Sequence, residues 1–238
     1  MKAVTYKSLR DGVLRRMGLD AAQPVMDSQA SALADYLAEA VDVAWSFYVW
    51  PDVTLTEQRT PAIHTLTLEE AAPANPIGRI LHIYDEHPGS DSSYAKELDF
   101  TQGDTTAEIT DDSHADSVPV WVRFRLPAPQ FTSEAYNAAT TYAPGDLVYH
   151  APTSDCYLCL AATTGNAPTS TAYWRRQQVP AYLADHARTY AHAMTLEEDG
   201  QYDKAAYQRA RAEGQLVARM DEFWLQASKV HHFSARFQ

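Results

Sequence analysis

The chain has 238 residues, of which 45% are hydrophobic and 21% charged, which excludes a disordered or fibrous protein. Its 31 acidic and 19 basic residues give a formal net charge of −12, which repels a nucleic-acid backbone unless the basic residues are segregated. No apolar run approaches the roughly 20 residues that span a bilayer, and the N-terminus lacks the apolar core of a signal peptide. We therefore expect a protein assembled in a cytoplasm, without a membrane partner.

A short amphipathic helix is predicted first, ending near Gly18, a residue type that commonly terminates helices. Arg10, Arg15 and Arg16 form a small basic cluster on this segment, which we interpret as a solvated helix face. A loop containing Pro24 follows, so this helix and the next are expected to form an antiparallel pair. The apolar face of the first helix comprises Tyr6, Leu9, Val13, Leu14 and Met17.

A longer helix is predicted from about Ser28 to about Val49. Asp27 or Ser28 can cap its start by accepting a backbone N–H bond, and Pro51 forces the preceding residue out of helical geometry. The aromatic run from Trp45 to Trp50 either joins this helix to the β region that follows or anchors a neighbouring subunit. The apolar stripe comprises Leu33, Tyr36, Leu37, Ala40, Val41, Ala44, Trp45 and Tyr48.

From Thr54 the sequence changes to short segments rich in β-branched and aromatic residues, separated by Pro, Gly, Asp and Ser. The last segment shows the two-residue period of a half-buried strand, with Val120, Val122 and Phe124 on one face and Trp121, Arg123 and Arg125 on the other. An antiparallel sheet is therefore predicted, with strands at residues 54–60, 63–68, 79–84, 94–100 and 118–126.

A compact β module is predicted at residues 133–179, where Tyr, Thr, Pro and Gly are dense. Its two cysteines, Cys156 and Cys159, are too few for a four-ligand zinc site. On a strand their spacing places the two thiols on opposite faces, so we interpret them as small buried side chains.

Two more helices are predicted after Pro180, separated by the segment Glu197 to Gly200. The final residues, 230–238, show no clear period and are either a tail that becomes ordered on a partner or a frayed terminus. The candidate partner-docking residues of this tail are His231, His232, Phe233, Arg236 and Phe237. The stripes of the two helices are Tyr182, Leu183, His186, Ala187, Tyr190, Ala191 and Met194, and then Tyr202, Ala206, Ala210, Val217, Met220, Phe223, Trp224 and Ala227.

The predicted fold class is α+β. Amphipathic helices from both ends of the chain need an apolar partner, and we expect them to form a four-helix bundle with an inserted antiparallel β-sheet and the small β module. The expected domains are residues 1–132, the helix pair plus sheet; residues 133–179, the module; and residues 180–238, the C-terminal helix pair and tail, packing with residues 1–52.

The chain carries no motif of a known catalytic or cofactor site. A phosphate-binding Gly-rich loop, a Gly-x-Ser-x-Gly elbow and a His-Glu-x-x-His pair are all missing from the sequence. His82 and His87 flank two acidic residues, and a metal ion held there with Asp91 is the alternative to a solvated loop. We expect no catalytic residues, no metal and no cofactor, and a hydrolase with a site assembled from distant residues is the remaining enzymatic alternative.

Residues 136–179 resemble the small chitin-binding type of carbohydrate-binding module found in bacterial chitinases and in many phage proteins. The matching residues are Tyr136 in place of the usual opening Trp, the segment Tyr142 to Tyr149 with its Gly145-Asp146 turn, Tyr157, Thr163, Thr164, Pro168 and Trp174. The resemblance implies a glycan-binding or docking surface formed by Tyr142, Tyr149, Tyr157 and Trp174. The aromatic residues that normally follow the Tyr157 position are Leu158, Cys159 and Leu160 here, which favours docking over sugar binding.

The remainder of the chain resembles the head–tail connector, or adaptor, proteins of tailed bacteriophages. The resemblance rests on the helix leading into Trp45 to Asp52, on Glu57-Gln-Arg59, on the strand at 120–125 and on the closing helices joined at Gly200 to Ala205. It implies a ring of commonly twelve copies in the virion neck, between the portal protein and the next neck or tail protein. Genomic DNA would pass through the ring without sequence-specific binding.

The sequence thus leads to the hypothesis of a structural virion protein, an adaptor-ring subunit that forms part of the DNA channel. The C-terminal tail would dock on the portal, and an acidic channel wall would repel duplex DNA and let it slide. The alternative is a glycan-binding accessory protein that acts through the module at residues 133–179.

Overall fold

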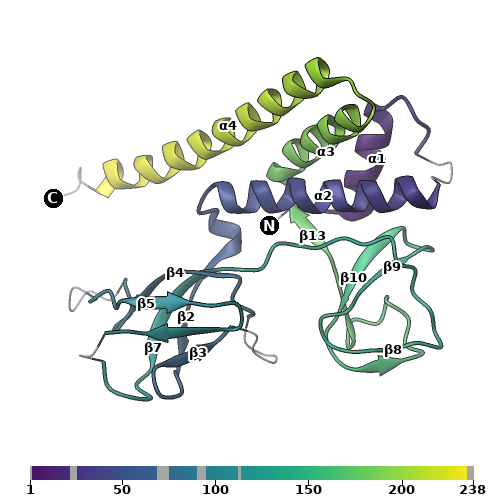
Figure 1. Cartoon of the computed structure of the whole chain (residues 1–238). Helices are drawn as coiled ribbons and strands as arrows, with labels where there is room; N and C mark the ends of the chain where they lie inside the picture. The colour runs from purple at the N-terminus through teal and green to yellow at the C-terminus, as the bar shows by residue number, and fades with distance from the viewer. Residues whose placement is uncertain (1, 22–25, 69–74, 90–94, 112–113, 235–238) are drawn as a thin grey trace. The chain divides into compact units, whose positions relative to one another are not determined.

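The computed structural model describes residues 2–21, 26–68, 75–89, 95–111 and 114–234, and for residues 227–234 it describes the backbone alone. These residues form two compact units (Figure 1). Unit 1 combines the two ends of the chain, Met1–Tyr48 and Pro129–Gln238, and unit 2 is Val49–Ala128. Unit 1 contains all four described α-helices together with the β module, and unit 2 contains two further β-sheets.

The first helix of unit 1, α1, spans Tyr6–Arg16. The Thr5 side chain accepts a bond from the Ser8 backbone N–H, which satisfies one of the free donors of the first turn. The helix ends where predicted, because Gly18 adopts a left-handed φ of 79° and the Leu19 N–H bonds back to the Leu14 carbonyl. Its buried face is formed by Tyr6, Leu9, Val13 and Leu14.

The second helix, α2, spans Asp27–Phe47, within two residues of the predicted bounds. The predicted stripe is confirmed at Leu33, Leu37, Ala40, Val41, Ala44 and Trp45, all of which are buried. Tyr36 is only half-buried, because its hydroxyl reaches the surface and donates to Glu198 at 3.0 Å. After the helix, Pro51 begins a 3-10 turn at Pro51–Val53, labelled η1.

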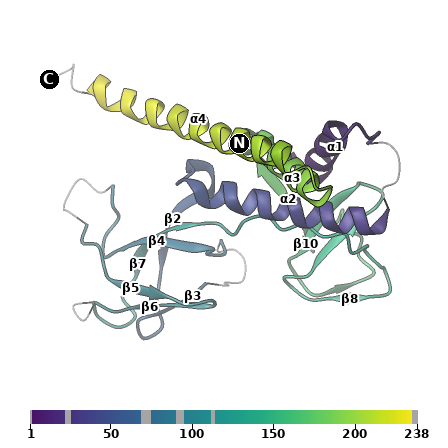
Figure 2. The ribbon, with the colours of Figure 1, turned by 45° about the horizontal axis from the view of Figure 1, so that its top comes forward.

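The expected four-helix bundle is wrong. A four-helix bundle packs its helices around one shared core, whereas here α4, at Tyr202–Ser234, packs mainly on α3, at Ala184–Glu198, and not on α1 or α2. Helix α3 is instead the central helix and packs against each of the other three (Figures 1 and 2). Small buried side chains permit this close approach on several sides, namely Ala184, Ala187, Thr189, Ala191 and Ala193.

The buried face of α4 also differs from the predicted one. The sequence favoured Ala206, Ala210 and Val217, which the structure leaves exposed. The buried residues are Ala205, Ala212 and Leu216, each 2% exposed or less. Alanines occur on several faces of this helix, so apolar spacing alone does not identify the buried face.

A buried histidine connects α3 to α4. His186 of α3 is 3% exposed, and its Nδ1–H donates to the Ala212 carbonyl of α4 at 2.9 Å. Burial lowers the pKa of His186 below 6.5, although its hydrogen bond to the Ala212 carbonyl partly offsets this effect.

The free energy of unfolding is therefore expected to fall as the pH drops below 6.5. In that range the unfolded chain binds a proton that the folded chain excludes, and the loss stops below the folded-state pKa. His192 has a pKa lowered by burial and by Arg16, and it contributes with the same sign. Urea unfolding between pH 5 and 8 measures the slope, and His186→Asn should reduce it. An unchanged slope in this variant would contradict the assignment.

The β module consists of two small antiparallel sheets. One has the order β12-β10-β9 and the other β11-β8. The bounds are β8 Thr141–Tyr142, β9 Leu147–His150, β10 Asp155–Cys159, β11 Thr163–Thr164 and β12 Trp174–Arg176. A further strand, β13 at Gln178–Pro180, leaves the module and pairs with β1 at Ala3–Thr5, with Val4 opposite Val179. The first residues of the chain are thereby joined to the end of the module.

Unit 2 contains two three-stranded antiparallel sheets, with orders β2-β7-β4 and β3-β6-β5. The bounds are β2 Thr54–Arg59, β3 Thr65–Thr67, β4 Arg79–Tyr84, β5 Phe100–Gln102, β6 Thr106–Ile109 and β7 Val120–Arg125. Side chains from both sheets share one core, which includes Leu66, Ile80, Ile83, Ile109, Val120, Val122 and Phe124. The predicted alternation in β7 is confirmed, because Val120, Val122 and Phe124 are fully buried.

One strand of unit 2 was placed wrongly and another was missed. The strand predicted at 94–100 lies at Phe100–Gln102, and β6 was not predicted at all. The two form a tight hairpin closed by the Gly103 N–H bond to the Thr106 carbonyl at 2.8 Å. Burial alternates in β6, but the strand has four residues and only Ala107 and Ile109 are apolar, which is too few for the sequence to reveal the period.

Candidate functional site

The hairpin formed by β9 and β10 holds α1 at two points. Asp155, at the start of β10, is 4% exposed, and its Oδ1 accepts the Lys7 backbone N–H at 2.9 Å. Tyr149, in β9, accepts a hydrogen bond on its hydroxyl from Arg10 at 3.0 Å. Ser154 in the connecting turn has a left-handed φ of 58°, an uncommon conformation for a residue with a side chain. The module is thus attached to the helices by charged and polar contacts as well as by β1.

Aromatic packing strengthens this attachment. The Tyr6 ring of α1 lies 5.1 Å from the Phe131 ring and 6.2 Å from the Tyr149 ring, the latter edge to face. Tyr6 is 2% exposed, and burial raises the pKa of its hydroxyl, which therefore stays protonated at neutral pH.

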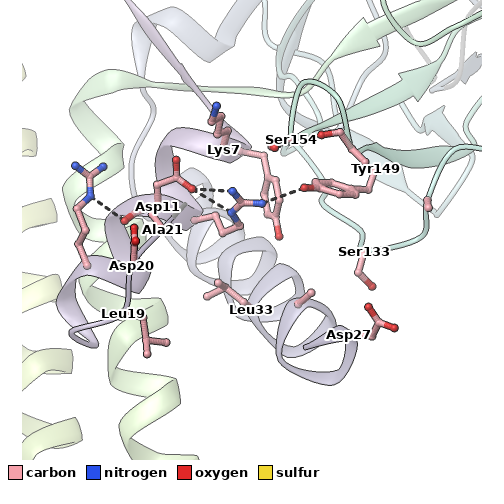
Figure 3. A pocket seen from close by; sticks show the side chains of 16 residues that line it. Lys7, Asp11, Leu19, Asp20, Ala21, Asp27, Leu33, Ser133, Tyr149 and Ser154 are labelled. Atoms are coloured by element: carbon pink, nitrogen blue, oxygen red, sulfur yellow. Dashed lines mark hydrogen bonds and ion pairs between the residues drawn. The ribbon is translucent and has the colours of Figure 1, made fainter. Parts of the chain in front are cut away.

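An open groove of about 960 Å³ lies beside this attachment (Figure 3). It is bounded by α1, the start of α2 and the β9–β10 hairpin, all within unit 1. Polar side chains in the groove include Lys7, Arg10, Asp11, Arg15, Asp20, Asp27, Ser133, Tyr149 and Ser154, and apolar ones include Leu19 and Leu33. The three basic and three acidic side chains balance, so the groove has no net charge that would select a phosphate or a nucleic acid.

Arg10 is the most constrained side chain of the groove. Its Nε and one terminal nitrogen donate to Asp11 Oδ1 at 3.1 and 2.8 Å, and its other terminal nitrogen donates to Tyr149. Burial lowers the pKa of the guanidinium, but the hydrogen bonds to Asp11 and Tyr149 more than compensate and hold the pKa above its ordinary value. The earlier interpretation of Arg10 as part of a solvated basic face is wrong, because its side chain is 15% exposed and paired.

The described side chains of the groove are suited to binding a polar ligand. Three of the five N–H donors of Arg10 are already used, and the remaining donors and the nearby serine hydroxyls can bind a polar ligand. In the described residues of the groove, no nucleophile is bonded to a general base as acyl or phosphoryl transfer requires.

The aromatic residues predicted as a glycan or docking surface are mostly buried. Tyr142, Tyr157 and Trp174 are 9%, 3% and 2% exposed, and together they form the core of the module. The Tyr142 and Trp174 rings pack edge to face, with 5.2 Å between their centroids. Only Tyr149 is half-exposed, and it faces the groove. A module this small needs large aromatic residues for its interior, and these three rings therefore present no open face for stacking.

Both cysteines are buried free thiols, as predicted. The Cys156 Sγ donates to the Thr132 carbonyl at 3.3 Å and the Cys159 Sγ to the Ala161 carbonyl at 3.1 Å. Burial raises the pKa of Cys156 to about 12 and also raises that of Cys159, so neither carries the reactive thiolate at neutral pH.

We expect neither thiol to react with iodoacetamide at pH 8 in the folded protein. Both should be alkylated once urea unfolds unit 1, because unfolding removes burial and restores ordinary pKa values. Intact mass spectrometry before and after denaturation counts the adducts. Rapid labelling of Cys156 without urea would show that the module opens away from Thr132 in the native state.

The predicted tail residues lie at or beyond the C-terminal limit of the residues that the structure describes. Helix α4 continues to Ser234, so the segment from Val230 is helical where the sequence showed no clear period. His231, His232 and Phe233 lie on this last turn, of whose side chains nothing is described. Arg236 and Phe237 lie outside the described residues, and docking on a portal stays a prediction.

The metal-site alternative finds no support in the described residues. His82 Nδ1 bonds to Glu97 at 2.7 Å, whereas the His87 ring packs edge to face on Trp121 at 4.5 Å. Asp91 lies outside the described residues. In the part of the chain that the structure describes, no three His, Cys, Asp or Glu side chains converge as metal ligands.

Among the described helices, none combines the length and apolar character needed to cross a bilayer.

A second candidate surface lies on α4. Val217, Met220 and Trp224 follow one another at the spacing of a single helix stripe, called the α4 stripe below. Val217 is 39% exposed and Trp224 is 63% exposed, whereas Leu216 on the adjacent face is 2% exposed. An exposed tryptophan on a regular apolar stripe is typical of a protein-binding surface.

The chain matches no protein-family model, and no curated protein matches it. The functional interpretation therefore rests on three features of the structure, namely the groove, the attachment of the module and the α4 stripe. It also rests on the sequence motifs that resemble phage connectors.

Proposed function

We propose that this chain is a structural subunit of a homo-oligomeric ring, the head–tail adaptor beneath the portal of a tailed bacteriophage. The observation that carries this proposal is helix α4, which continues past the N-terminal end of α3 (Figure 1). Its continuation carries the α4 stripe, in which Val217 and Trp224 are exposed. A helix of 33 residues is about 50 Å long, and a partner of 15 residues covers about 22 Å of that length. The uncovered apolar surface is explained by association with other chains.

Two further observations support a structural role. Several of the described ionisable groups are paired with one another within unit 1, such as Arg10 with Asp11 and Arg209 with Glu197. The net charge of −12 suits a channel through which duplex DNA slides without binding. The C-terminal residues from His231 would then contact the portal, and another face would meet the next neck or tail protein.

The glycan-binding alternative is weakened by the burial of Tyr142, Tyr157 and Trp174. Sugar recognition by stacking requires an open aromatic face, and these rings are covered by one another. Binding to chitin beads by the folded protein, lost in Tyr149→Ala but not in a surface control such as Tyr207→Ala, would restore this alternative.

Native mass spectrometry and negative-stain electron microscopy of the purified protein test the proposal. We expect a closed ring, commonly of twelve copies, and labelling of the neck when virions are treated with an antibody to the chain. A protein that stays monomeric at every concentration and is missing from virions would overturn it.

A further inference from the structure

We propose that an acidic stripe on α2 of one copy binds a basic cluster formed by α1, α3 and α4 of the next copy, and that this contact orients neighbouring copies in the ring. The inference rests on the proposed ring and names a contact between its subunits. Both patches lie in unit 1. The acidic stripe is Asp35, Glu39 and Asp42, and the basic cluster is Arg16, Arg188, His192 and Arg211.

The acidic stripe lies on the exposed side of α2. Its three carboxylates are spaced by four and three residues, which places them on one face of the helix, away from the buried face. Helix α2 contains no Lys or Arg in its 21 residues, so no pair along the helix neutralises the stripe. Like charges at these spacings repel one another and destabilise a helix. Among the ion pairs of the described residues, none includes a carboxylate of the stripe.

The basic cluster forms where α1 and α4 pack on α3. Arg188 of α3 donates to the carbonyl and hydroxyl of Ser8 in α1, at 3.3 and 3.0 Å. Arg16 of α1 donates in the other direction, to Thr189 of α3 at 2.5 Å. These bonds hold both guanidinium groups at the α1–α3 contact, and Arg211 is exposed on α4.

The positive charges of the cluster act on one another. Burial lowers the pKa of Arg16, Asp185 partly offsets this effect, and the charges of Arg211 and Arg188 lower the pKa further. Burial and the charge of Arg16 also lower the pKa of His192. Asp185 pairs with Arg188 at 3.3 Å, whereas the described ion pairs include neither Arg16 nor Arg211. The cluster therefore has an excess of positive charge.

The stripe and the cluster do not neutralise each other within one chain. Helix α3 lies between α4 and α2 and packs on both (Figures 1 and 2). Glu39 accepts a bond from the Tyr190 hydroxyl at 3.2 Å, and Arg209 of α4 lies over the same ring, but its guanidinium is paired with Glu197. The charge of the stripe is therefore neutralised only from outside the chain.

A second copy is the partner that matches both patches, because it supplies the opposite charge to each. The stripe from Asp35 to Asp42 is about 10 Å long, and packed helices lie about 8–10 Å apart, so the patches are of similar size. A contact between two different patches is heterologous, and its repetition gives a ring when the rotation closes. Exposed ion pairs add little affinity, whereas opposed like charges are strongly unfavourable, so the contact selects the orientation of the copies.

The test reverses the charge of each patch in the full chain. The stripe-reversed chain carries Asp35→Lys, Glu39→Lys and Asp42→Lys, and the cluster-reversed chain carries Arg16→Glu and Arg211→Glu. All five positions are exposed on helices, and Lys and Glu are good helix formers, so both chains are expected to fold, which circular dichroism checks. If the double variant does not fold, Arg211→Glu alone replaces it.

The matched control reverses three exposed carboxylates of unit 2, at Asp52, Asp104 and Glu108. Their replacement by Lys changes the net charge as much as reversal of the stripe does.

We expect neither reversed chain to form rings alone, because its stripe and its cluster then have the same sign. An equimolar mixture should form rings in which the two chains alternate, because each stripe then meets a cluster of opposite sign. Native mass spectrometry identifies this alternation by mass. The wild type and the control should both form rings, and these should dissociate as the NaCl concentration rises.

Rings from either reversed chain alone, or no assembly in a mixture of two folded chains, would overturn the contact and leave the ring function standing. Loss of rings in the unit 2 control would show that net charge, and not the stripe, governs assembly. Duplex DNA binding by the wild type that is lost in the cluster-reversed chain would assign the cluster to nucleic acid instead. A monomeric wild-type protein would overturn the contact and the ring together.

Discussion

Trp174→Ala is expected to produce the largest loss of stability in unit 1, about 3–5 kcal/mol in the free energy of unfolding. The indole is 2% exposed and packs on Tyr142 at 5.2 Å and on Tyr136 at 6.0 Å. Its Nε1–H also donates to the Asn166 carbonyl at 3.0 Å, so truncation leaves both a cavity and a carbonyl without its donor. A loss of this size is a large fraction of the roughly 5–15 kcal/mol that stabilises a typical domain.

Urea unfolding followed by far-UV circular dichroism measures this loss, and Trp224→Ala is the matched control. Trp224 is 63% exposed, so the same chemical change there should alter the stability of the chain by no more than about 0.5 kcal/mol. Equal losses in the two variants would mean that the module core does not depend on Trp174. The pair also separates folding from assembly, because only Trp224 belongs to the α4 stripe.

Asp155→Ala should cost about 2 kcal/mol, because it removes the buried carboxylate that caps α1 from the module. The Lys7 N–H, one of the first-turn donors, loses its acceptor at 2.9 Å. Arg176 also loses the carboxylate that lies 3.8 Å from its Nε, although the Arg176 side chain is 43% exposed and this part of the effect is small.

Asp155→Asn serves as the control, since the amide oxygen can still accept the Lys7 N–H. This variant should lose only part of the stability that Asp155→Ala loses, as measured by urea unfolding. Cys156, the next residue of β10, should become more reactive to iodoacetamide in Asp155→Ala, because the hairpin is held less firmly on α1. Unchanged stability and unchanged thiol reactivity in Asp155→Ala would contradict the capping role.

The local structure was predictable where burial follows a regular period. The stripe from Leu33 to Trp45 determined α2, and the alternation of Val120, Val122 and Phe124 determined β7. Both elements are long enough for several residues to repeat on one face. The stripe of α4 was harder, because alanines on several of its faces satisfy the same spacing.

Structure that depends on distant residues was not predictable. Strand β1 has three residues and forms only because β13 pairs with it, and β6 depends on its partners on both sides. The prediction of a four-helix bundle was wrong for a related reason. The spacing of apolar residues indicated four amphipathic helices, but it did not show that the small residues of α3 let the other three helices pack on α3.

The candidate site was only partly visible in the sequence. Tyr149 was named, but its partner Arg10 was interpreted as solvated and Asp155 was not singled out. The signal was weak, because a charged residue on a short helix is usually exposed, and only the fold brings Asp155 to the start of α1 from 148 residues away. The opposite error was made for three aromatic residues, which were predicted to form a surface but are buried, because an aromatic motif does not reveal whether its rings face outward. These residues are Tyr142, Tyr157 and Trp174.

The division of unit 1 between the two ends of the chain has a consequence for biosynthesis. Unit 2 is one continuous segment, so its two sheets can form while the ribosome is still translating the rest. Strand β1 cannot pair until Val179 has left the ribosome, and the Lys7 N–H of α1 has no acceptor until Asp155 has done so. Until then the apolar face of α1 is accessible to chaperones and to premature contacts. The order of synthesis therefore places the completion of unit 1, and with it any association between copies, after the last helices have been made.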